Sequence, residues 1–435
     1  MSETKIHPSS GNTDLPMFNH WEVPPTQRDI EKIITTEHRP VSTLSSSSNI
    51  EFRFKTAFNE HVLMHKTNLY IRASIKLTPK NEPMKNTDWS SLKPANYLLH
   101  SMFKNIEVQI GGKQFSSKPA TYPYRAFIDA KFGFTNDAKK SHMTSALWTE
   151  TVADRLDLVK PDASSSKQTV GKEFELMGRL HIDLAFQGKT IVGGSDIRII
   201  LTPHDPSFYL QFDSGSNIKT AEVTFHDASL YVKTALLHHD FVEYHNQGIA
   251  KSPAKYMLPV AEVRQDTVPM GSLDVSFDNI CNGLLPNLFI VQLVESEAYN
   301  GSFNKDPYEF NHHDLIYCCT YVNGHQVPLN AYQTDFDRGI YLRSFLSLAQ
   351  AVNQDGMDSI LGISRTSYPK GNVHHAFNFS QDGTTGMTSS VNPLRYGNLR
   401  VVLRFKKPVP VALTALFYCT FDQCLEIDEN RLPLP

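Results

Sequence analysis

Hydrophobic and polar residues alternate with a period of two along most of the chain. Ile50, Phe52 and Phe54 are separated by charged residues, and the same alternation runs from Leu69 to Leu77. Because successive side chains of a strand point to opposite faces of its sheet, each such run predicts a strand with one buried face. The 22 glycines and 25 prolines lie scattered between these runs, which is typical of β-sandwiches and barrels.

The same alternation predicts further strands in both halves of the chain. In the first half they are expected at 106–110, 174–186, 197–201, 209–212 and 221–234. In the second half they are expected at 261–277, 288–295, 315–322, 376–380, 399–405 and 411–427. Helical spacing predicts helices at 123–134 and 338–352.

The apolar positions of these strands form the predicted core. In the first half they are Phe52, Phe54, Ile71, Ile75, Val108, Ile110, Ile199, Leu201, Val223 and Phe225. In the second half they are Val291, Leu293, Val401, Leu403, Leu416 and Tyr418.

The two halves repeat one order of motifs. The hairpin Ile106–Gln114 corresponds to Tyr317–Gln326, and a helix follows each hairpin. Farther along, His181–Gln187 corresponds to His375–Gln381, and a long apolar strand comes last in both halves. This order predicts two copies of one β unit of about 200 residues, the size of a single β domain.

We therefore predict an all-β fold, a double jelly roll of two tandem eight-stranded antiparallel β-sandwiches with a few short helices. An immunoglobulin sandwich fits less well, because its Cys…Trp…Cys spacing is absent. The predicted domains are an N-terminal arm at 1–48, a first jelly roll at 49–236, a linker helix at 237–257, and a second jelly roll with a C-terminal tail at 258–435.

The polar segment before the first predicted strand is interpreted as an assembly arm. Its sequence from Val23 to Lys32 predicts a turn followed by a short helix with Thr26 as N-cap. We expect the arm to become ordered by docking on a neighbouring subunit or on an inner component of an assembly; a flexible tail is the alternative. The residues expected to dock, three of them at the spacing of an apolar helical stripe, are Trp21, Val23, Pro24, Pro25, Ile30, Ile33 and Ile34.

Charge argues against a broad surface for nucleic acid. The chain has 42 Lys and Arg residues against 45 Asp and Glu, a net charge of -3, so no specific nucleic-acid binding is expected. Runs of about 18 apolar residues and a signal-peptide pattern are both missing, so we expect synthesis in the cytoplasm. The cysteines show no disulfide or zinc spacing and are expected to be reduced and mostly buried. They are Cys281, Cys318, Cys319, Cys419 and Cys424.

Sequence signatures of enzymes are also missing. GxSxG, GxxxxGK[ST] and HExxH do not occur, so we expect no enzymatic activity, no cofactor and no metal. His239 and Glu243 would share a helical face, but a zinc site needs three or four converging ligands, and we interpret this stretch as a hydrated linker helix. The pairs His312–His313 and His374–His375 flank strands, either as ordinary loop residues or as interface groups that titrate near neutral pH.

Four segments are distinctive in combination. They are Val23–Lys32, Asn96–Val108, Tyr122–Ile128 and Phe174–Leu184. These segments resemble the major capsid protein of Polinton (Maverick) elements and adintovirus-like viruses, a double jelly-roll capsid family. The resemblance covers nearly the whole chain from about Val23 and is strongest in the first half.

This resemblance implies a homotrimer with a pseudo-hexagonal outline that tiles an icosahedral shell around double-stranded DNA. The implied partners are other copies of the chain in a capsid lattice, a single jelly-roll penton protein, and minor capsid or cement proteins. The implied location is the virion, after synthesis in the host cytoplasm and assembly in the host cell. Two alternatives stay open: a carbohydrate-binding β-sandwich protein, and a host-domesticated copy that no longer assembles.

Overall fold

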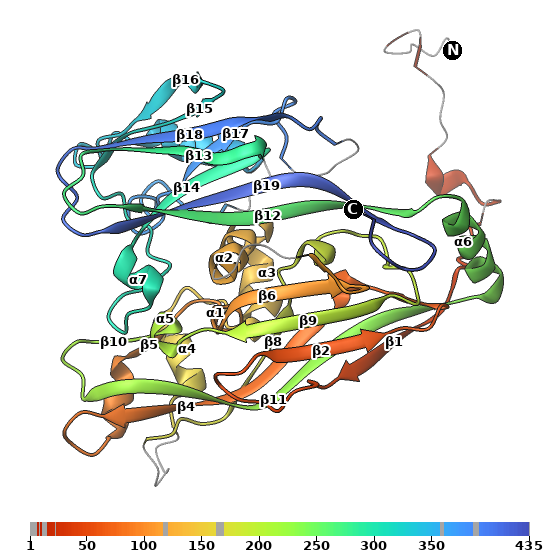
Figure 1. Ribbon diagram of the computed structural model, residues 1–435, viewed down its shortest axis with the longest axis horizontal. Coiled ribbons are helices and arrows are strands. Elements are labelled where there is room, and N and C mark those ends of the chain that lie inside the picture. Colours follow the sequence, from red (N-terminus) through yellow and green to blue (C-terminus); the bar gives the residue numbers. More distant parts are fainter. Residues whose placement is uncertain are drawn as a thin grey trace.

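The two halves of the chain form two jelly rolls that lie one above the other in the computed structural model shown in Figure 1. The structure describes residues 7, 9–10, 15–21, 23–115, 121–161, 169–356, 361–385 and 391–434. Parts of the expected arm, residues 1–6, 8, 11–14 and 22, therefore lie outside the described residues.

Among the described residues, the two sheets of the first roll contain eight strands in jelly-roll order and one short additional strand. The eight strands are β1 (Ile30–His38), β2 (Ile50–Lys55), β4 (Asn68–Pro79), β6 (Phe103–Ile110), β7 (Lys113–Phe115), β8 (Phe174–Arg179), β9 (Asp196–Pro203) and β11 (Ile218–Leu237). One sheet has the order β1-β11-β4-β8 and the other β2-β9-β6-β7, with antiparallel pairing throughout. The short β3 (Glu60–Val62) also pairs with β11, and β5 (Leu92–Pro94) pairs with β10 (Leu210–Phe212) in a separate small sheet.

The second roll repeats this arrangement. Its strands are β12 (Ala254–Val268), β13 (Asp274–Leu284), β14 (Leu288–Glu295), β15 (Leu315–Val322), β16 (His325–Gln333), β17 (His375–Asn378), β18 (Tyr396–Phe405) and β19 (Leu413–Ile427). The sheet orders are β12-β19-β14-β17 and β13-β18-β15-β16, again antiparallel. Each strand occupies the position of its first-roll counterpart, so the predicted double jelly roll and its tandem repeat are confirmed.

The repeat extends to the hairpin turns. Gly111-Gly112 joins β6 to β7 and Asn323-Gly324 joins β15 to β16, and all four residues have positive φ, at 55°, 81°, 50° and 82° in chain order. Two left-handed residues in a row form the tight turn whose twist matches that of the flanking strands. Glycine and asparagine adopt this conformation at least cost, which explains their occurrence at both turns.

Helices occupy the connections between strands. They are α1 (Leu98–Ser101), α2 (Tyr122–Gly133), α3 (Asn136–Lys140), α4 (Val152–Val159), α5 (Pro206–Tyr209), α6 (His239–Lys251), α7 (Ser296–Asn300) and α8 (Leu342–Ala351). The 3₁₀ turns are η1 (Pro16–Phe18), η2 (Met64–Lys66), η3 (Asn86–Ser91), η4 (His142–Ala146) and η5 (Asp183–Ala185). Both helices expected after the hairpins are present, as α2 and α8, and α6 connects the two rolls (Figure 1). Among the described residues, no helix is long and apolar enough to cross a membrane.

The prediction of a short helix within the arm is wrong. Residues Ile30–His38 form strand β1, which pairs antiparallel with β11 at the edge of the first sheet. Ile30, Ile34 and His38 are half-buried, and the six residues between them are exposed. Half-buried residues at every fourth position resemble the apolar stripe of a helix. Here they belong to an edge strand that is largely exposed and has an irregularity between Ile30 and Lys32.

Two predicted strands have different limits in the structure. The stretch expected at 261–277 is divided between β12 and β13 by a turn at Met270-Gly271, where Gly271 has a positive φ of 85°. The stretch expected at 174–186 ends as a strand at Arg179, and η5 follows. Strand β16 was not predicted as an element, because Pro328 interrupts its alternation. Proline is tolerated there because β16 is the edge strand of its sheet.

Every residue predicted for the two cores is buried, with at most 7% of its surface exposed. The second roll has its own cluster of apolar side chains between its two sheets. The larger cluster of the first roll continues into the second through Ile290, Leu416 and Tyr418. The two rolls therefore pack against each other through a continuous apolar contact.

The residues after β19 return to the first roll. The Arg431 guanidinium donates to the backbone oxygen of Gly193 at 2.7 Å and to Oδ1 of Asn246 at 2.7 Å. Lys113 Nζ donates to the backbone oxygen of Pro433 at 2.5 Å. We call this set of contacts the C-terminal clasp. It ties the end of the second roll to the hairpin and connections of the first.

The core assignment predicts the effect of truncating Ile110, which is fully buried between the sheets of the first roll. Ile110→Ala should lower the free energy of unfolding by about 2–5 kcal/mol, because it removes buried methyl groups and leaves a cavity. Urea denaturation would measure this loss. Ile33→Ala on β1 is the matched control, because Ile33 is 51% exposed. This variant should lower the free energy of unfolding far less. Equal losses for the two variants would contradict the assignment.

Candidate functional site

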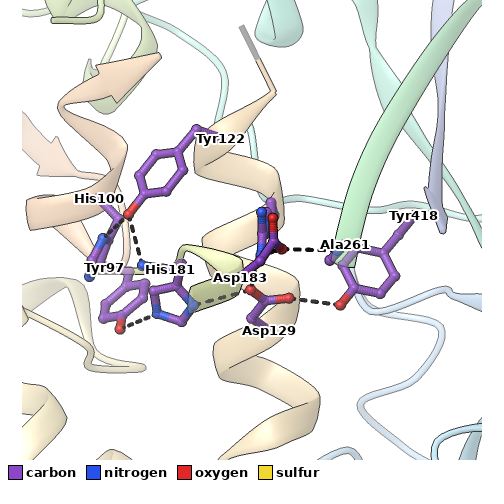
Figure 2. Close-up of polar contacts among 9 residues, drawn as sticks. Tyr97, His100, Tyr122, Asp129, His181, Asp183, Ala261 and Tyr418 are labelled. Atoms are coloured by element: carbon purple, nitrogen blue, oxygen red, sulfur yellow. Dashed lines mark hydrogen bonds and ion pairs between the residues drawn. The ribbon is translucent and has the colours of Figure 1, made fainter. Parts of the chain in front are cut away.

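Charged side chains are buried where the first roll meets the second (Figure 2). Arg125 of α2 donates to Oδ1 of Asp183 at 2.5 Å, and its Nε lies 3.5 Å from Oδ2 of Asp129 one helical turn later. Both carboxylates also bind the second roll. Tyr418 OH on β19 donates to Asp129 Oδ1 at 2.7 Å, and the backbone N–H of Ala261 on β12 donates to Asp183 Oδ1 at 3.3 Å.

The network continues inside the first roll through aromatic and histidine side chains. His181 Nδ1 lies 3.3 Å from Asp129 Oδ2, and His181 Nε2 lies 2.8 Å from Tyr97 OH. The Tyr122 hydroxyl accepts from the backbone N–H of His181 at 3.3 Å and lies 2.8 Å from His100 Nδ1. Because a carboxylate only accepts, His181 donates from Nδ1, and its Nε2 accepts from Tyr97.

Burial determines the protonation states in this junction. Burial lowers the pKa of His181, and lowers the pKa of His100 much further, so both rings are neutral. Burial alone would raise the pKa of Asp129. The hydrogen bonds from His181 and Tyr418 and the charge of Arg125 outweigh this effect, and the pKa lies below its ordinary value. Asp129 is therefore an ionised carboxylate with fixed partners in both rolls.

This arrangement holds two domains in register. Displacing one roll against the other would remove the Tyr418 and Ala261 donors from two buried carboxylates, and a buried acceptor that loses its donor is costly. The polar atoms of Asp129 and Asp183 are directed at protein donors on both sides. A pocket of about 240 Å³ is lined by Arg125 and Asp129 together with apolar side chains such as Phe132 and Phe186. The chemistry is that of a structural junction.

Sequence reasoning did not identify this junction. The available signal was the pair Arg125 and Asp129, four residues apart on a helix that is otherwise largely apolar. Such a pair predicts a salt bridge on one helical face. Its partner Tyr418 is 289 residues away in the sequence and was predicted only as a core residue.

The structure leaves the predicted docking residues of the arm largely exposed. Trp21 and Val23 are 88% and 86% exposed, and Pro24 and Pro25 are exposed as well. Ile33 lies on the exposed side of β1. Ile30 packs beside Leu237 and the apolar side of α6. The structure therefore does not bring these residues together within one copy of the chain.

An open groove lies beside the start of β1. Its volume is about 760 Å³, and it is bounded by Ile30, by Phe241 and Tyr244 of α6, and by His61 and Tyr256. The lining is mainly apolar, and both the arm and α6 leave the rolls at this end of the molecule (Figure 1).

The histidine residues singled out in the sequence do not form a metal site. Within the described part of the chain, no three His, Cys, Asp or Glu side chains are placed to hold a metal ion. The His239 side chain is 89% exposed on α6. His245 instead faces His61, with the ring centres 5.4 Å apart. The interpretation of this stretch as a hydrated helix agrees with these positions.

One predicted pair of loop histidines is buried. His374 and His375 are nearly inaccessible, so neither interpretation of this pair, loop residue or titrating interface group, is correct. His375 Nδ1 lies 2.8 Å from Ser344 Oγ on α8, and burial lowers the pKa of His375 to about 4. His312 and His313 are half-buried, and the ring of His312 stacks on Phe336.

The cysteines have the environments expected for reduced structural thiols. Cys281, Cys318, Cys319 and Cys419 are buried, Cys424 is exposed, and none of the five is joined in a disulfide. Their distribution confirms the expectation from the sequence.

Comparison with known proteins places the chain among double jelly-roll structures. The structural match to a chain of the Sputnik virophage structure covers all of this chain and 94% of that chain, with a TM-score of 0.60 and 12% identity. For the faustovirus major capsid protein the coverage is 96% and 93%, with a TM-score of 0.59 and 8% identity. For the mavirus major capsid protein it is 99% and 96%, with a TM-score of 0.55 and 9% identity. At these identities the likeness shows the fold, and it extends over both rolls.

Sequence comparison alone gives a narrower result. No protein-family model matches the chain. An uncharacterised protein of Caenorhabditis elegans, F54H12.2, is 21% identical over 359 residues, which cover 78% of this chain and 81% of that protein.

The junction predicts a specific effect for Tyr418→Phe. Loss of the hydroxyl removes one donor from the buried Asp129 carboxylate and should lower the free energy of unfolding by about 1–3 kcal/mol. Tyr70→Phe is the control, because Tyr70 OH donates to Glu175 at 2.9 Å on the exposed face of β4 and β8. Its effect should stay within about 0.5 kcal/mol. Chemical denaturation of both variants checks the difference, and a Tyr418→Phe variant as stable as the control would contradict the role of the junction.

Proposed function

We propose that this chain is the major capsid protein of a double-stranded DNA virus or virus-like element. The observation that carries the proposal is the double jelly roll itself, which matches the mavirus and faustovirus major capsid proteins over nearly the full length of both partners. A further similar structure is a chain of the PBCV-1 virus capsid, with a TM-score of 0.58 and 10% identity. The fold alone does not determine function, so this assignment needs an assembly experiment.

Two equivalent rolls on one chain favour a trimer. Because both rolls have the same topology, three chains present six similar rolls, and six similar units approximate a hexagon. Hexagonal units can tile a closed shell. The rigid junction at Arg125, Asp129 and Tyr418 supports this proposal, since a pseudo-hexagonal outline requires a fixed angle between the two rolls.

The finer assignments follow from the resemblance of four sequence segments to the capsid proteins of Polinton elements and adintovirus-like viruses. On this basis the proposed partners are a single jelly-roll penton protein and minor capsid or cement proteins, and the proposed location is the virion, with assembly in the host cell. Specific binding of nucleic acid is not part of the proposal. The basic cluster near the end of β18 fits this, because Arg404, Lys406 and Lys407 all lie within 4.0 Å of carboxylates.

A second function, a host-retained copy that no longer assembles, is favoured by one observation. The relative found by sequence is a protein of an animal, Caenorhabditis elegans. The carbohydrate-binding alternative loses its support. Trp89 and Trp148 are buried, with 1% and 6% exposure, and Trp21 lies in the arm, so no tryptophan is available on the surface of either roll to stack against a sugar.

Assembly state distinguishes these functions. A capsid protein should elute as a trimer near three times the 49.1 kDa of the chain in light scattering at physiological salt, and form shells visible by negative-stain microscopy. A host-retained copy should keep the same fold by circular dichroism without forming shells. A purely monomeric species at high protein concentration would contradict the capsid proposal.

We also propose that the arm docks on a neighbouring copy. The residues Leu15, Met17, Phe18, Trp21 and Val23 are more than half exposed, which is unusual for so many large apolar side chains in a short segment. The apolar groove between Ile30 and α6 lies at the same end of the molecule and is the receiving surface that this proposal favours on the next copy. Strand β1 then anchors the arm to its own roll.

Removing residues 1–25 tests the arm while leaving β1 intact. The truncated chain should keep its melting temperature, since these residues do not pack in either core, but trimer or shell yield should fall. The replacement Trp21→Ser with Val23→Ser should reproduce the defect at full length. Thr26→Ser with Arg28→Ser, at exposed polar positions of the same segment, is the control. Normal shell yield from the truncated chain would show that the arm is dispensable.

A further inference from the structure

A polar pocket of about 520 Å³ lies between the helices of the first roll and the loops of the second. Lys131 of α2, Lys139 of α3 and Arg155 of α4 line it from the first roll. Asp306 and Lys370 line it from the second. The pocket is separate from the charged junction, and neither the capsid proposal nor the fold requires cationic side chains here.

The three first-roll cations have no counter-ion in direct contact. Lys139 and Arg155 are only 8% and 5% exposed. Among the described residues, Glu150 and Asp306 attract these cations from beyond ion-pair distance. Arg155 Nε is buried without a hydrogen-bond partner among the described residues. Burying an unpaired charge is costly, so an anion bound beside this guanidinium would be stabilising.

The lysine contacts leave room for an anion. Lys139 Nζ donates to the backbone oxygen of Lys131 at 2.6 Å, and Lys131 Nζ donates to Oδ1 of Asn372. Both ammonium groups also lie over aromatic rings, Lys131 at 5.2 Å from the centre of Phe127 and Lys139 at 5.8 Å from that of Trp148. Each ammonium carries three donors, so each retains donors for a ligand.

The net charge of the residues that line the pocket indicates how many negative charges a bound anion would carry. Four cationic side chains face three carboxyl groups, those of Glu150, Asp306 and Glu309. Burial raises the pKa of Asp306 and lowers the pKa values of Lys131 and Lys139 to about 8, so both lysines stay mostly protonated at neutral pH. The pocket therefore has a modest positive excess, which suits an anion of one or two charges better than a highly charged polyanion.

We propose that this pocket binds a phosphate group, of free phosphate or of a phosphomonoester such as a nucleotide, through Arg155, Lys139 and Lys131. Guanidinium and ammonium donors together are the usual protein ligands of phosphate, and arginine binds two of its oxygens in a planar fork. The pocket is larger than one phosphate, which leaves space for the ester group. Because the lining comes from both rolls, the bound anion stabilises the inter-roll contact.

Isothermal titration of the full chain with sodium phosphate, and separately with AMP, tests the proposal against sodium chloride at matched ionic strength. We expect saturable binding with a dissociation constant at or below roughly 1 mM and a melting temperature that rises with ligand concentration. Binding of both ligands, or of AMP alone, identifies the source of the phosphate group. No saturable binding of either ligand would overturn the proposal.

Variants identify the residues. Arg155→Gln and Lys139→Met should each weaken binding about tenfold or more. Lys93→Gln, which alters an exposed pair with Asp213, is the control and should bind as the unaltered chain does. Without phosphate, Arg155→Gln should melt at the same temperature as the unaltered chain or higher, because it removes an unpaired buried charge. Unchanged affinity in both pocket variants would show that the anion binds elsewhere.

Discussion

The structure depends on a buried ion-pair cluster in the first roll whose two carboxylates accept hydrogen bonds from strands of the second roll. Arg125 neutralises Asp129 and Asp183, and each carboxylate then accepts a hydrogen bond from the other roll. An apolar contact alone is non-directional and tolerates sliding. The charged groups add direction, since a shift of the second roll would leave Asp129 buried without Tyr418. The angle between the two rolls is therefore fixed by chemistry as well as by packing.

Much of the fold could be predicted from the sequence because most strands bury one face. The alternation at Phe52 and Phe54, or at Ile71 and Ile75, reflects a sheet with one side against the core, and these residues are buried. The tandem repeat was visible for the same reason, since equivalent strands need similar apolar faces. The turn at Gly111-Gly112 was predictable because its backbone conformation restricts the residues that can occupy it.

The rest could not be predicted because it depends on partners distant in the chain. Strand β1 has both its edge and most of its side chains exposed, so no core imposes alternation on it. Its half-buried residues recur at every fourth position, and this spacing in the sequence predicts a helix. His375 looked like a loop residue because its burial depends on Ser344 and the packing of α8. The cationic pocket is lined by residues of α2, α3 and α4 and of second-roll loops, and the pattern of hydrophobic and polar positions does not predict contacts between such distant segments.

The separation of the junction's two sides along the chain has a consequence for synthesis. Asp129 and Tyr418 are 289 residues apart in the sequence. At the usual ribosomal rate of about 5–20 residues per second, Asp129 is therefore synthesised roughly 15–60 s before Tyr418. During that interval the face of the first roll that will receive its neighbour carries a guanidinium and two carboxylates, which water solvates well. A purely apolar face would be exposed to other nascent chains on the same polysome for the same time. The charged groups thus reduce the apolar fraction of the face that the half-made protein exposes, and the clasp at Arg431 forms only after β19 has been synthesised.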